Sequence, residues 1–261
     1  MKKRLLVSAL VLVMALAGLM ARTVVIAGGT GEIGSGNVIN LARNGVNVVL
    51  ETHNPAGAAA LIEAAEGLPG TVKAMSSDTG YDELFQAVAE EFGAVDGLII
   101  TTGDMDAAKG IEELEIEELR ARLENKIVEC FMRVQAAVPY LKAAGNSRII
   151  LNSCSGAMDG NLIENTFDEV CGGALISMTY ALARELAAEG VTVNCIARSG
   201  MINDHTVPGK LDIADYVDKV PAGSAGTSDD YASLVEYIIS EESRFVTGNV
   251  FNLSGGLYIG R

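Results

Sequence analysis

A glycine-rich turn between a strand pattern and a helix pattern constrains this chain more than any other feature. Residues 23–27 are β-branched or apolar and lead into the turn Gly28-Gly29-Thr30-Gly31-Glu32-Ile33-Gly34. An amphipathic helical pattern follows the turn, and then a second apolar run at 46–50. In a βαβ unit, such glycines permit a tight turn, close approach of a pyrophosphate, and close packing of helix on strand. Helix amides and the helix dipole then attract the phosphates. The turn therefore predicts dinucleotide binding, and the alternative is a purely structural glycine turn.

The rest of the chain continues the alternation of strands and helices. This pattern predicts a parallel sheet covered by helices on both faces, which is a doubly wound α/β fold. A length of 261 residues suits one Rossmann domain, from residue 22 to 261, with no visible linker. We expect strands at 72–75, 97–100, 148–151, 191–197 and 250–253, and helices at 55–68, 81–92, 173–189 and 229–240, with two helical pieces between 111 and 144.

Charge and cysteine content narrow the classes of function. The net charge of −15 argues against a nucleic-acid partner, because phosphate backbones require a basic face, and otherwise indicates a soluble protein. The widely spaced cysteines show no CxxC pattern, so we expect reduced, buried thiols and no metal site. They are Cys130, Cys154, Cys171 and Cys195.

The N-terminal segment allows two interpretations. Basic residues at 2–4 and an apolar run at 5–20 resemble a secretory signal, although the run is short for a spanning helix. Alternatively, translation begins at Met14 or Met20. A nicotinamide cofactor favours a cytoplasmic location, and the alternative is export or membrane contact through residues 5–20.

Several segments in order resemble the short-chain dehydrogenase/reductase family, from Thr23 to the end. They are Asp78, Asp96-Gly97-Leu98-Ile99-Ile100-Thr101-Thr102-Gly103, Asn125, Leu182-Ala183-Arg184-Glu185-Leu186, Gly190-Val191-Thr192-Val193-Asn194, Val246-Thr247-Gly248-Asn249-Val250 and Gly255-Gly256. The resemblance implies an NAD(P)-dependent oxidoreductase acting on an alcohol or carbonyl. It also implies a homodimer or homotetramer built from the helices within 111–144 and 173–189. The apolar periodicity of Val134, Ala137, Leu175, Met178 and Leu182 permits that interface, and burial against the sheet explains it equally well.

The resemblance also implies positions that contact the cofactor. Asp78 stands where the family contacts adenine, with Thr79 beside it, and Thr102 and Gly103 follow the fourth strand. The position that often holds an acid for the ribose of NAD is Thr52, between Glu51 and His53. The choice between NAD and NADP therefore stays open, with NAD slightly favoured by Glu51.

The catalytic positions depart from the family pattern. Ser155 aligns with the catalytic serine and Asn125 with the helical asparagine, but Asp168 occupies the tyrosine position and Gly172 the lysine position. An aspartate has a reference pKa of about 3.9 and is a poor acid at neutral pH. Asp168→Tyr with Gly172→Lys is therefore expected to move the protein toward ordinary carbonyl reduction. Tyr180 and Arg184 have a related spacing but come 12 residues late, which indicates helix packing.

Other side chains near these positions leave the mechanism open. Glu164, Asp168 and Glu169 either raise one another's pKa, which would make Asp168 an acid or base, or are solvated loop charges. Ser153 is a further candidate, whereas a nucleophilic Cys171 is disfavoured because the two histidines, at 53 and 205, are distant in sequence. Three hypotheses follow: an oxidoreductase with a rearranged acid/base set of Ser155, Asn125 and Asp168, a non-catalytic nucleotide-binding protein, and a non-redox lyase or isomerase. The substrate cannot be read from the polar segment 201–220.

Overall fold

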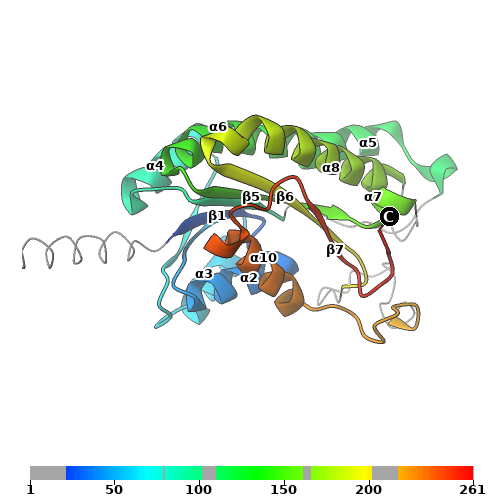
Figure 1. The fold of residues 1–261 in the computed structure, drawn as a ribbon, viewed down its shortest axis with the longest axis horizontal. Helices are drawn as coiled ribbons and strands as arrows, with labels where there is room; N and C mark the ends of the chain where they lie inside the picture. The colour runs from blue at the N-terminus through cyan, green and yellow to red at the C-terminus, as the bar shows by residue number, and fades with distance from the viewer. Residues whose placement is uncertain (1–21, 79, 102–109, 161–165, 202–216, 261) are drawn as a thin grey trace, which may run out of the picture.

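A seven-stranded parallel sheet forms the centre of the molecule (Figure 1). The computed structural model describes residues 22–78, 80–101, 110–160, 166–201 and 217–260, and within these ranges the strand order is β3-β2-β1-β4-β5-β6-β7. All neighbouring strands pair in parallel, as the sequence predicts. The strands are β1 (Thr23–Ala27), β2 (Asn47–Glu51), β3 (Val72–Met75), β4 (Gly97–Ile100), β5 (Ser147–Cys154), β6 (Val191–Arg198) and β7 (Val250–Leu253).

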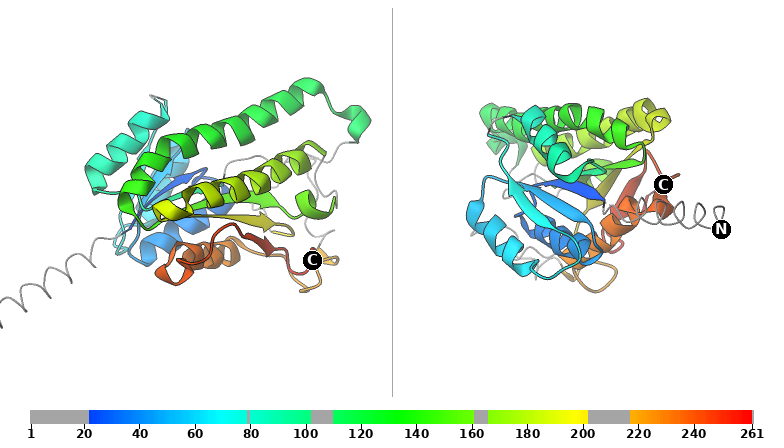
Figure 2. Two further views of the ribbon diagram at one scale, coloured as in Figure 1. Left: turned by 45° about the horizontal axis from the view of Figure 1, so that its top comes forward. Right: turned by 90° about the vertical axis from the view of Figure 1, so that its left-hand side faces the viewer.

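Helices cover both faces of this sheet (Figure 2). One face carries α4 (Tyr81–Phe92), α6 (Glu129–Ala144) and α8 (Thr166–Leu186), and the other carries α2 (Glu32–Arg43), α3 (Pro55–Ala64) and α10 (Ser228–Ile239). The π-helical turn η2 (Glu124–Val128) joins α6 to α5 (Ile116–Leu123) in one long rod. Short elements complete the described chain: η1 (Ile111–Glu113), α7 (Gly156–Asp159), η3 (Ala187–Glu189) and η4 (Glu241–Ser243).

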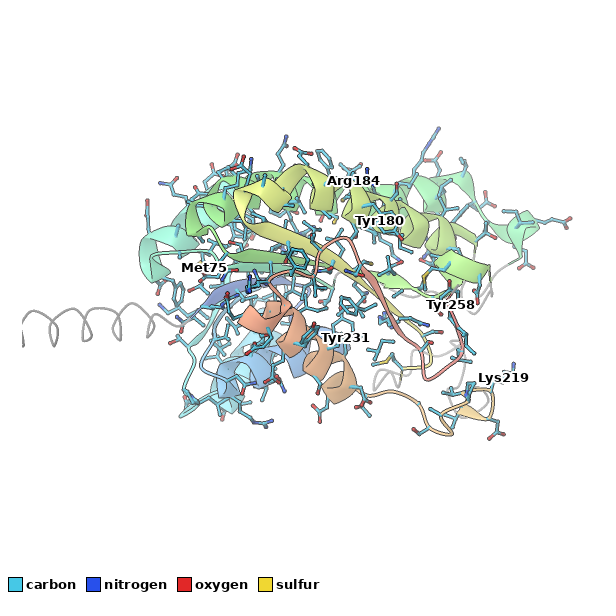
Figure 3. The ribbon with its side chains drawn as sticks, viewed as in Figure 1. Met75, Tyr180, Arg184, Lys219, Tyr231 and Tyr258 are labelled. Carbon is cyan, nitrogen blue, oxygen red and sulfur yellow. The ribbon has the colours of Figure 1, made fainter. Side chains whose placement is uncertain are left out.

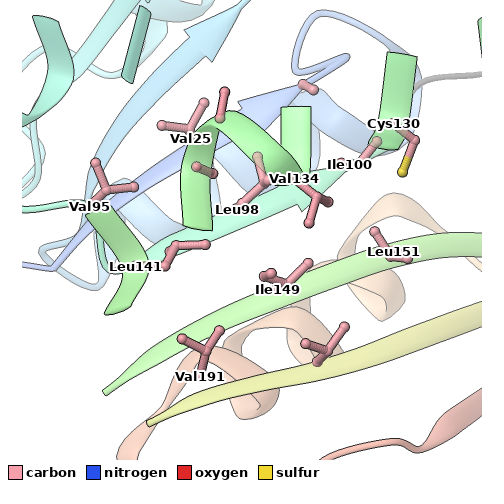
Figure 4. Packing of buried hydrophobic residues seen from close by; sticks show 14 of the residues in the cluster. Val25, Val95, Leu98, Ile100, Cys130, Val134, Leu141, Ile149, Leu151 and Val191 are labelled. Atoms are coloured by element: carbon pink, nitrogen blue, oxygen red, sulfur yellow. The ribbon is translucent and has the colours of Figure 1, made fainter. Parts of the chain in front are cut away.

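The two helical layers bury separate hydrophobic cores. Successive strand residues point to opposite faces, so Val25 and Ala27 of β1 face the layer of α4, α6 and α8, whereas Val24 and Ile26 face α2 and α10. Figure 4 shows the first core, where Leu98, Ile149 and Leu151 of the sheet lie beside Cys130, Val134 and Leu141 of α6. Burial on both faces explains why the central strands are almost continuously apolar.

The element boundaries agree with the sequence for β3, β4, β7 and α4, and they differ elsewhere, notably at the start of α8 and the end of β5. We expected a helix to begin at Gly173, the second glycine of a pair, but α8 begins at Thr166. At Gly172 the helix packs closely on the end of β5 and on α7: a Cβ there would lie 2.9 Å from Ser153 Oγ and Cys154 Sγ and 2.8 Å from Ala157 Cβ. β5 likewise extends to Cys154, three residues beyond the expected end. Asp168 and Cys171 therefore lie on a helix.

Some expectations concern residues outside the described part of the chain. These are the N-terminal segment 1–21, Thr79, Thr102, Gly103, Glu164, His205 and most of the segment 201–220. Within the described ranges, no helix has the length and apolar character that a membrane span requires.

Candidate functional site

The glycine turn has the geometry that its sequence predicts. Gly28 has a φ of 81°, which favours glycine, and its carbonyl accepts a hydrogen bond from the Gly31 amide at 3.0 Å. A Cβ at Gly34 would lie 2.2 Å from the Gly28 carbonyl oxygen, so this glycine is required for helix and strand to pack closely. Gly31 is exposed and forms the N-cap of α2 without a capping side chain. The first amides of α2 are therefore presented at the carboxyl edge of the sheet, as phosphate binding requires.

The end of β2 adjoins the glycine turn. Thr52 Oγ1 and Thr30 Oγ1 are 3.0 Å apart, and the Asn54 amide donates to Thr52 Oγ1 at 3.0 Å. His53 Nδ1 lies 3.3 Å from Asp78 Oδ1, and both side chains are largely exposed. The predicted residues Thr30, Thr52, His53 and Asp78 therefore gather at one edge.

Glu51 does not belong to this group, which removes the reason for slightly favouring NAD. Glu51 precedes Thr52 and points to the opposite face of the strand, where it is buried. Arg133 of α6 donates to both carboxylate oxygens at 2.8 Å, and Ser77 Oγ donates to Oε1 at 3.0 Å. The Arg133 guanidinium also lies 4.7 Å from the centre of the Tyr81 ring. The Glu51 carboxylate thus joins the sheet to α6 and is turned away from the ligand side.

Asp168 lies in a buried ion-pair cluster, which corrects the expectation of a solvated loop charge. Its side chain is 1% exposed, and Oδ1 accepts hydrogen bonds from Arg122 Nη1 at 2.6 Å and Lys126 Nζ at 2.5 Å. Because α8 begins at Thr166, Asp168 sits in its first turn and faces α5 and η2. A buried carboxylate is stable only when it is paired in this way.

The turn η2 determines which side chain reaches Asp168. Asn125, the expected catalytic asparagine, is exposed, whereas its neighbour Lys126 points inward with a side chain 15% exposed. Sequence reasoning missed both Lys126 and Arg122. The available signal was their spacing: two cations four residues apart share one helix face, within a segment rich in glutamate.

The end of β5 packs against the first turns of α8. Cys154 Sγ donates to Glu169 Oε2 at 3.3 Å and lies 4.0 Å from the Asp168 carbonyl oxygen. Ser153 Oγ donates to the Gly172 carbonyl at 3.0 Å, and Ser155, immediately before α7, is 3% exposed. Cys154 thus joins the end of β5 to the Asp168–Glu169 turn.

Two further candidates lie in unfavourable places. Cys171 is fully buried, and burial raises the pKa of its thiol, the opposite of what an activated nucleophile needs. Tyr180 and Arg184 project from the outer surface of α8 (Figure 3), and both are exposed. Their spacing therefore reflects a solvent face and not packing within the subunit.

A small open cavity lies at the carboxyl ends of β6 and β7, beside α10. Its volume is about 220 Å³, and its walls include backbone and small polar side chains. The lining residues are Ser199, Met201, Ala222, Ser224, Ala225, Gly226, Asp230, Leu253 and Gly255. None of the residues of the Asp168 cluster lines it.

Comparison with known proteins agrees with this architecture. Residues 28–258 match the family model described as enoyl-(acyl carrier protein) reductase. An uncharacterized oxidoreductase of Methylorubrum extorquens is 29% identical, with 92% of this chain and 98% of that protein aligned. A 3-oxoacyl-(acyl carrier protein) reductase of Staphylococcus epidermidis is 27% identical over 92% of this chain and its whole length. A 2,3-dihydroxy-2,3-dihydro-p-cumate dehydrogenase of Pseudomonas putida is 28% identical over 91% and 95% of the two chains.

Solved structures share the fold. A short-chain dehydrogenase/reductase from Mycobacterium ulcerans superposes with a TM-score of 0.83 at 22% identity, covering 90% of this chain and 89% of the other. One from Mycobacterium marinum gives the same TM-score at 19% identity, with 92% and 97% covered. Given the matched family model and the parallel sheet with its glycine turn, this chain belongs to the short-chain dehydrogenase/reductase family of oxidoreductases.

Proposed function

We propose that this protein binds NAD(H) or NADP(H) and derives from an alcohol or carbonyl oxidoreductase whose usual phenol acid has been lost. The observation that supports this proposal is the Asp168 cluster, because the family resemblance aligns Asp168 with the tyrosine that transfers the proton, and here this residue is a buried, ion-paired carboxylate. The glycine turn supports dinucleotide binding. The cluster indicates that any chemistry proceeds without a tyrosine at this position.

The residues fit a dinucleotide along the carboxyl edge of the sheet. In the strand order 3-2-1-4-5-6, the first three strands bind one mononucleotide half and the next three bind the other. Amides of α2 would hold the pyrophosphate, while Thr52, His53 and Asp78 would surround the adenosine ribose and adenine. Once bound, the nicotinamide supplies or accepts a hydride.

The paired Asp168 carboxylate is suited to accept hydrogen bonds and not to donate a proton. Two cations on one oxygen fit an ionised carboxylate, which has acceptors only. The family pattern has a tyrosine at this position, whose phenol protonates a carbonyl oxygen. This chain has Asp168 there and so lacks that phenol. The same observation favours a second candidate function, a nucleotide-binding protein without redox turnover. It gives no support to a lyase or isomerase, because the carboxylate is already engaged.

Fluorescence titration with NADH and NADPH tests the binding proposal, and Gly31→Asp is the decisive variant. A Cβ at Gly31 would meet only the Gly28 carbonyl oxygen, at 3.3 Å, so the fold should tolerate the change. The added carboxylate would repel the pyrophosphate, and we expect affinity to fall at least about a hundredfold, or about 2.7 kcal/mol. Gly31→Asn is the uncharged control and should lose much less. Unchanged affinity in a folded Gly31→Asp protein would disprove binding at this turn.

Turnover distinguishes the two candidate functions. We expect NADH and NADPH oxidation with a panel of ketones and aldehydes to be slow or absent, because a positioned acid usually contributes about 10²–10⁴-fold. Brisk turnover abolished by Asp168→Ala would instead make Asp168 part of the working acid/base set. Brisk turnover that survives this change would place the chemistry elsewhere.

A further inference from the structure

A second buried ion-pair network, separate from the Asp168 cluster, lies at the end of β2. Arg133 of α6 donates from Nε and Nη2 to the two carboxylate oxygens of Glu51, each at 2.8 Å. The remaining terminal nitrogen, Nη1, lies 3.0 Å from Glu129 Oε2. The side chains of Glu51 and Arg133 are 2% and 4% exposed. The proposed chemistry gives this network no role.

Net stability is a weak reason for a chain to keep such a network. Removing two charges from water is costly, and replacing a buried ion pair with apolar groups of similar volume is often neutral or stabilising. A planar guanidinium that binds both carboxylate oxygens does, however, fix the direction of the carboxylate. The Tyr81 ring, 4.7 Å from the guanidinium, holds Arg133 from another side. The network therefore determines where the Glu51 carboxylate points.

The fixed carboxylate joins two segments that carry proposed cofactor contacts. Ser77 Oγ donates to Glu51 Oε1 at 3.0 Å. Glu51 is the last residue of β2 and immediately precedes Thr52, and Ser77 immediately precedes Asp78. The pairing of β2 with β3 ends at Glu51 and Met75. The hydrogen bond from Ser77 thus connects the two segments beyond the end of the paired strands.

A second contact between the same segments is open to solvent. His53 Nδ1 lies 3.3 Å from Asp78 Oδ1, with both side chains largely exposed. Exposed ion pairs contribute little free energy, because water and salt screen them. The buried contact between Ser77 and Glu51 is therefore what holds the two segments at a fixed separation.

We propose that the Arg133–Glu51 pair, through Ser77, positions the two segments that would bind the adenosine half of the dinucleotide. This inference rests on the proposed dinucleotide function. The segments carry Thr52 and Asp78, and a binding site loses contacts when its residues move by more than about 0.5 Å. Arg133 would not touch the ligand, so α6 acts on adenosine affinity from the opposite side of β2.

Two probes separate the adenosine side from binding in general. ADP carries the adenosine half, whereas inorganic pyrophosphate would contact only the amides of α2, and competition against NADH fluorescence measures both. The paired substitution Arg133→Met with Glu51→Leu should stay folded, because neither charge is left buried alone. We expect ADP affinity to fall about tenfold or more and pyrophosphate affinity to stay within about twofold of the natural value.

Ser77 offers a smaller change together with a conservative rescue. Ser77→Ala removes the hydroxyl that reaches Glu51 and should weaken ADP about threefold or more, as loss of one hydrogen bond does. Ser77→Thr keeps a hydroxyl and should retain the natural ADP affinity. Arg148→Met is the matched control, because Arg148 is also a buried arginine but lies near the start of β5, at the opposite edge of the sheet. It should lower the melting temperature and leave ADP affinity unchanged.

A purely structural network gives a different result. If the paired substitution lowers the melting temperature but keeps the ADP-to-pyrophosphate affinity ratio of the natural protein, the proposal is wrong. Should the paired variant fail to fold, the Ser77 variants decide, and equal ADP affinities of Ser77→Ala and Ser77→Thr would refute the positioning role. A natural protein that binds neither NADH nor ADP would refute the dinucleotide function itself. A natural protein that binds both, with one ratio in all variants, would refute only the role of this network.

Discussion

At the scale of single residues, we expect the choice between NAD and NADP to depend on one position at the end of β2. Glu51 is bound by Arg133 on the opposite face, so Thr52, a neutral residue, is what the adenosine ribose would meet. A carboxylate at this position would repel a 2′-phosphate, whereas a threonine does not. We therefore expect the natural protein to bind NADH and NADPH with affinities within about tenfold of each other.

Thr52→Asp should give the protein a strong preference for NADH over NADPH. The new carboxylate should weaken NADPH about tenfold or more and leave NADH similar or tighter, because only NADPH carries the 2′-phosphate. Parallel titrations of both cofactors measure the change in ratio. Thr52→Asn controls for loss of the hydrogen bond to Thr30. Equal weakening of both cofactors by Thr52→Asp would show that the 2′-position lies elsewhere.

Buried thiols and a phenol predict how stability depends on pH. Burial raises the pKa of Cys130 and of Cys195 from 9.0 to about 12, and that of Tyr81 from 10.0 to about 12. Between these values the unfolded chain loses protons that the folded chain keeps, so stability falls as pH rises. The contribution of the two protonated thiols to the free energy of unfolding is complete below pH 9 and is lost progressively toward pH 12.

Urea unfolding at pH 8, 10 and 11 checks this prediction, and each of the two buried thiols can contribute up to about 1.4 kcal/mol per pH unit. The double variant Cys130→Ala with Cys195→Ala should be less stable at pH 8 but show a shallower decline above pH 9. A natural protein equally stable at pH 8 and 11 would contradict the burial of these groups.

At the scale of elements, the packing of α8 explains which parts of the site the sequence could predict. The glycine turn was predictable because its residues are local and each glycine has a separate geometric reason. The Asp168 cluster was not, because it joins residues 42 and 46 positions apart. The sequence did not predict the helix start at Thr166 because Gly172 and Gly173 locally weaken a helix. A glycine at 172 is needed because α8 packs there too closely on its neighbours for a Cβ to fit.

The same contact changes the expectation for a restored Tyr and Lys pair. Gly172→Lys would force a side chain between α8 and β5, so we now expect the double change Asp168→Tyr with Gly172→Lys to damage the fold before it restores activity.

Adjacent glycines offer a clean test of this packing. Gly172→Ala should lower the free energy of unfolding by about 1–3 kcal/mol, as overpacking does. Gly173→Ala should be neutral or should stabilise by up to about 1 kcal/mol, because nothing lies within 4 Å of its Cβ position and alanine favours helix. Urea denaturation of both variants measures the difference. Equal effects at the two positions would mean that α8 is not packed on β5 as described.

At the scale of the whole molecule, the expected helix interface needs different residues from those first suggested. Val134, Ala137 and Leu175 belong to the core, and Met178 and Leu182 pack against it, so burial against the sheet explains their periodicity. The outer surfaces of α6 and α8 instead expose large apolar side chains. They are Phe131 at 53%, Met132 at 47%, Val170 at 52% and Tyr180 at 49%.

These exposed side chains lead us to expect a homodimer through α6 and α8. Isolated apolar residues on a surface are ordinary, but several large ones on two helices of the same layer indicate an interface, and a two-fold axis would pair each helix with its copy. Phe131→Glu with Val170→Glu should bury charges at that interface and give monomers at micromolar concentration in light scattering. Phe245→Glu, at a residue 94% exposed and outside both helices, is the control and should leave the dimer intact. A natural protein that is monomeric across this concentration range would contradict the interface, and a dimer that survives the double substitution would place it on another surface.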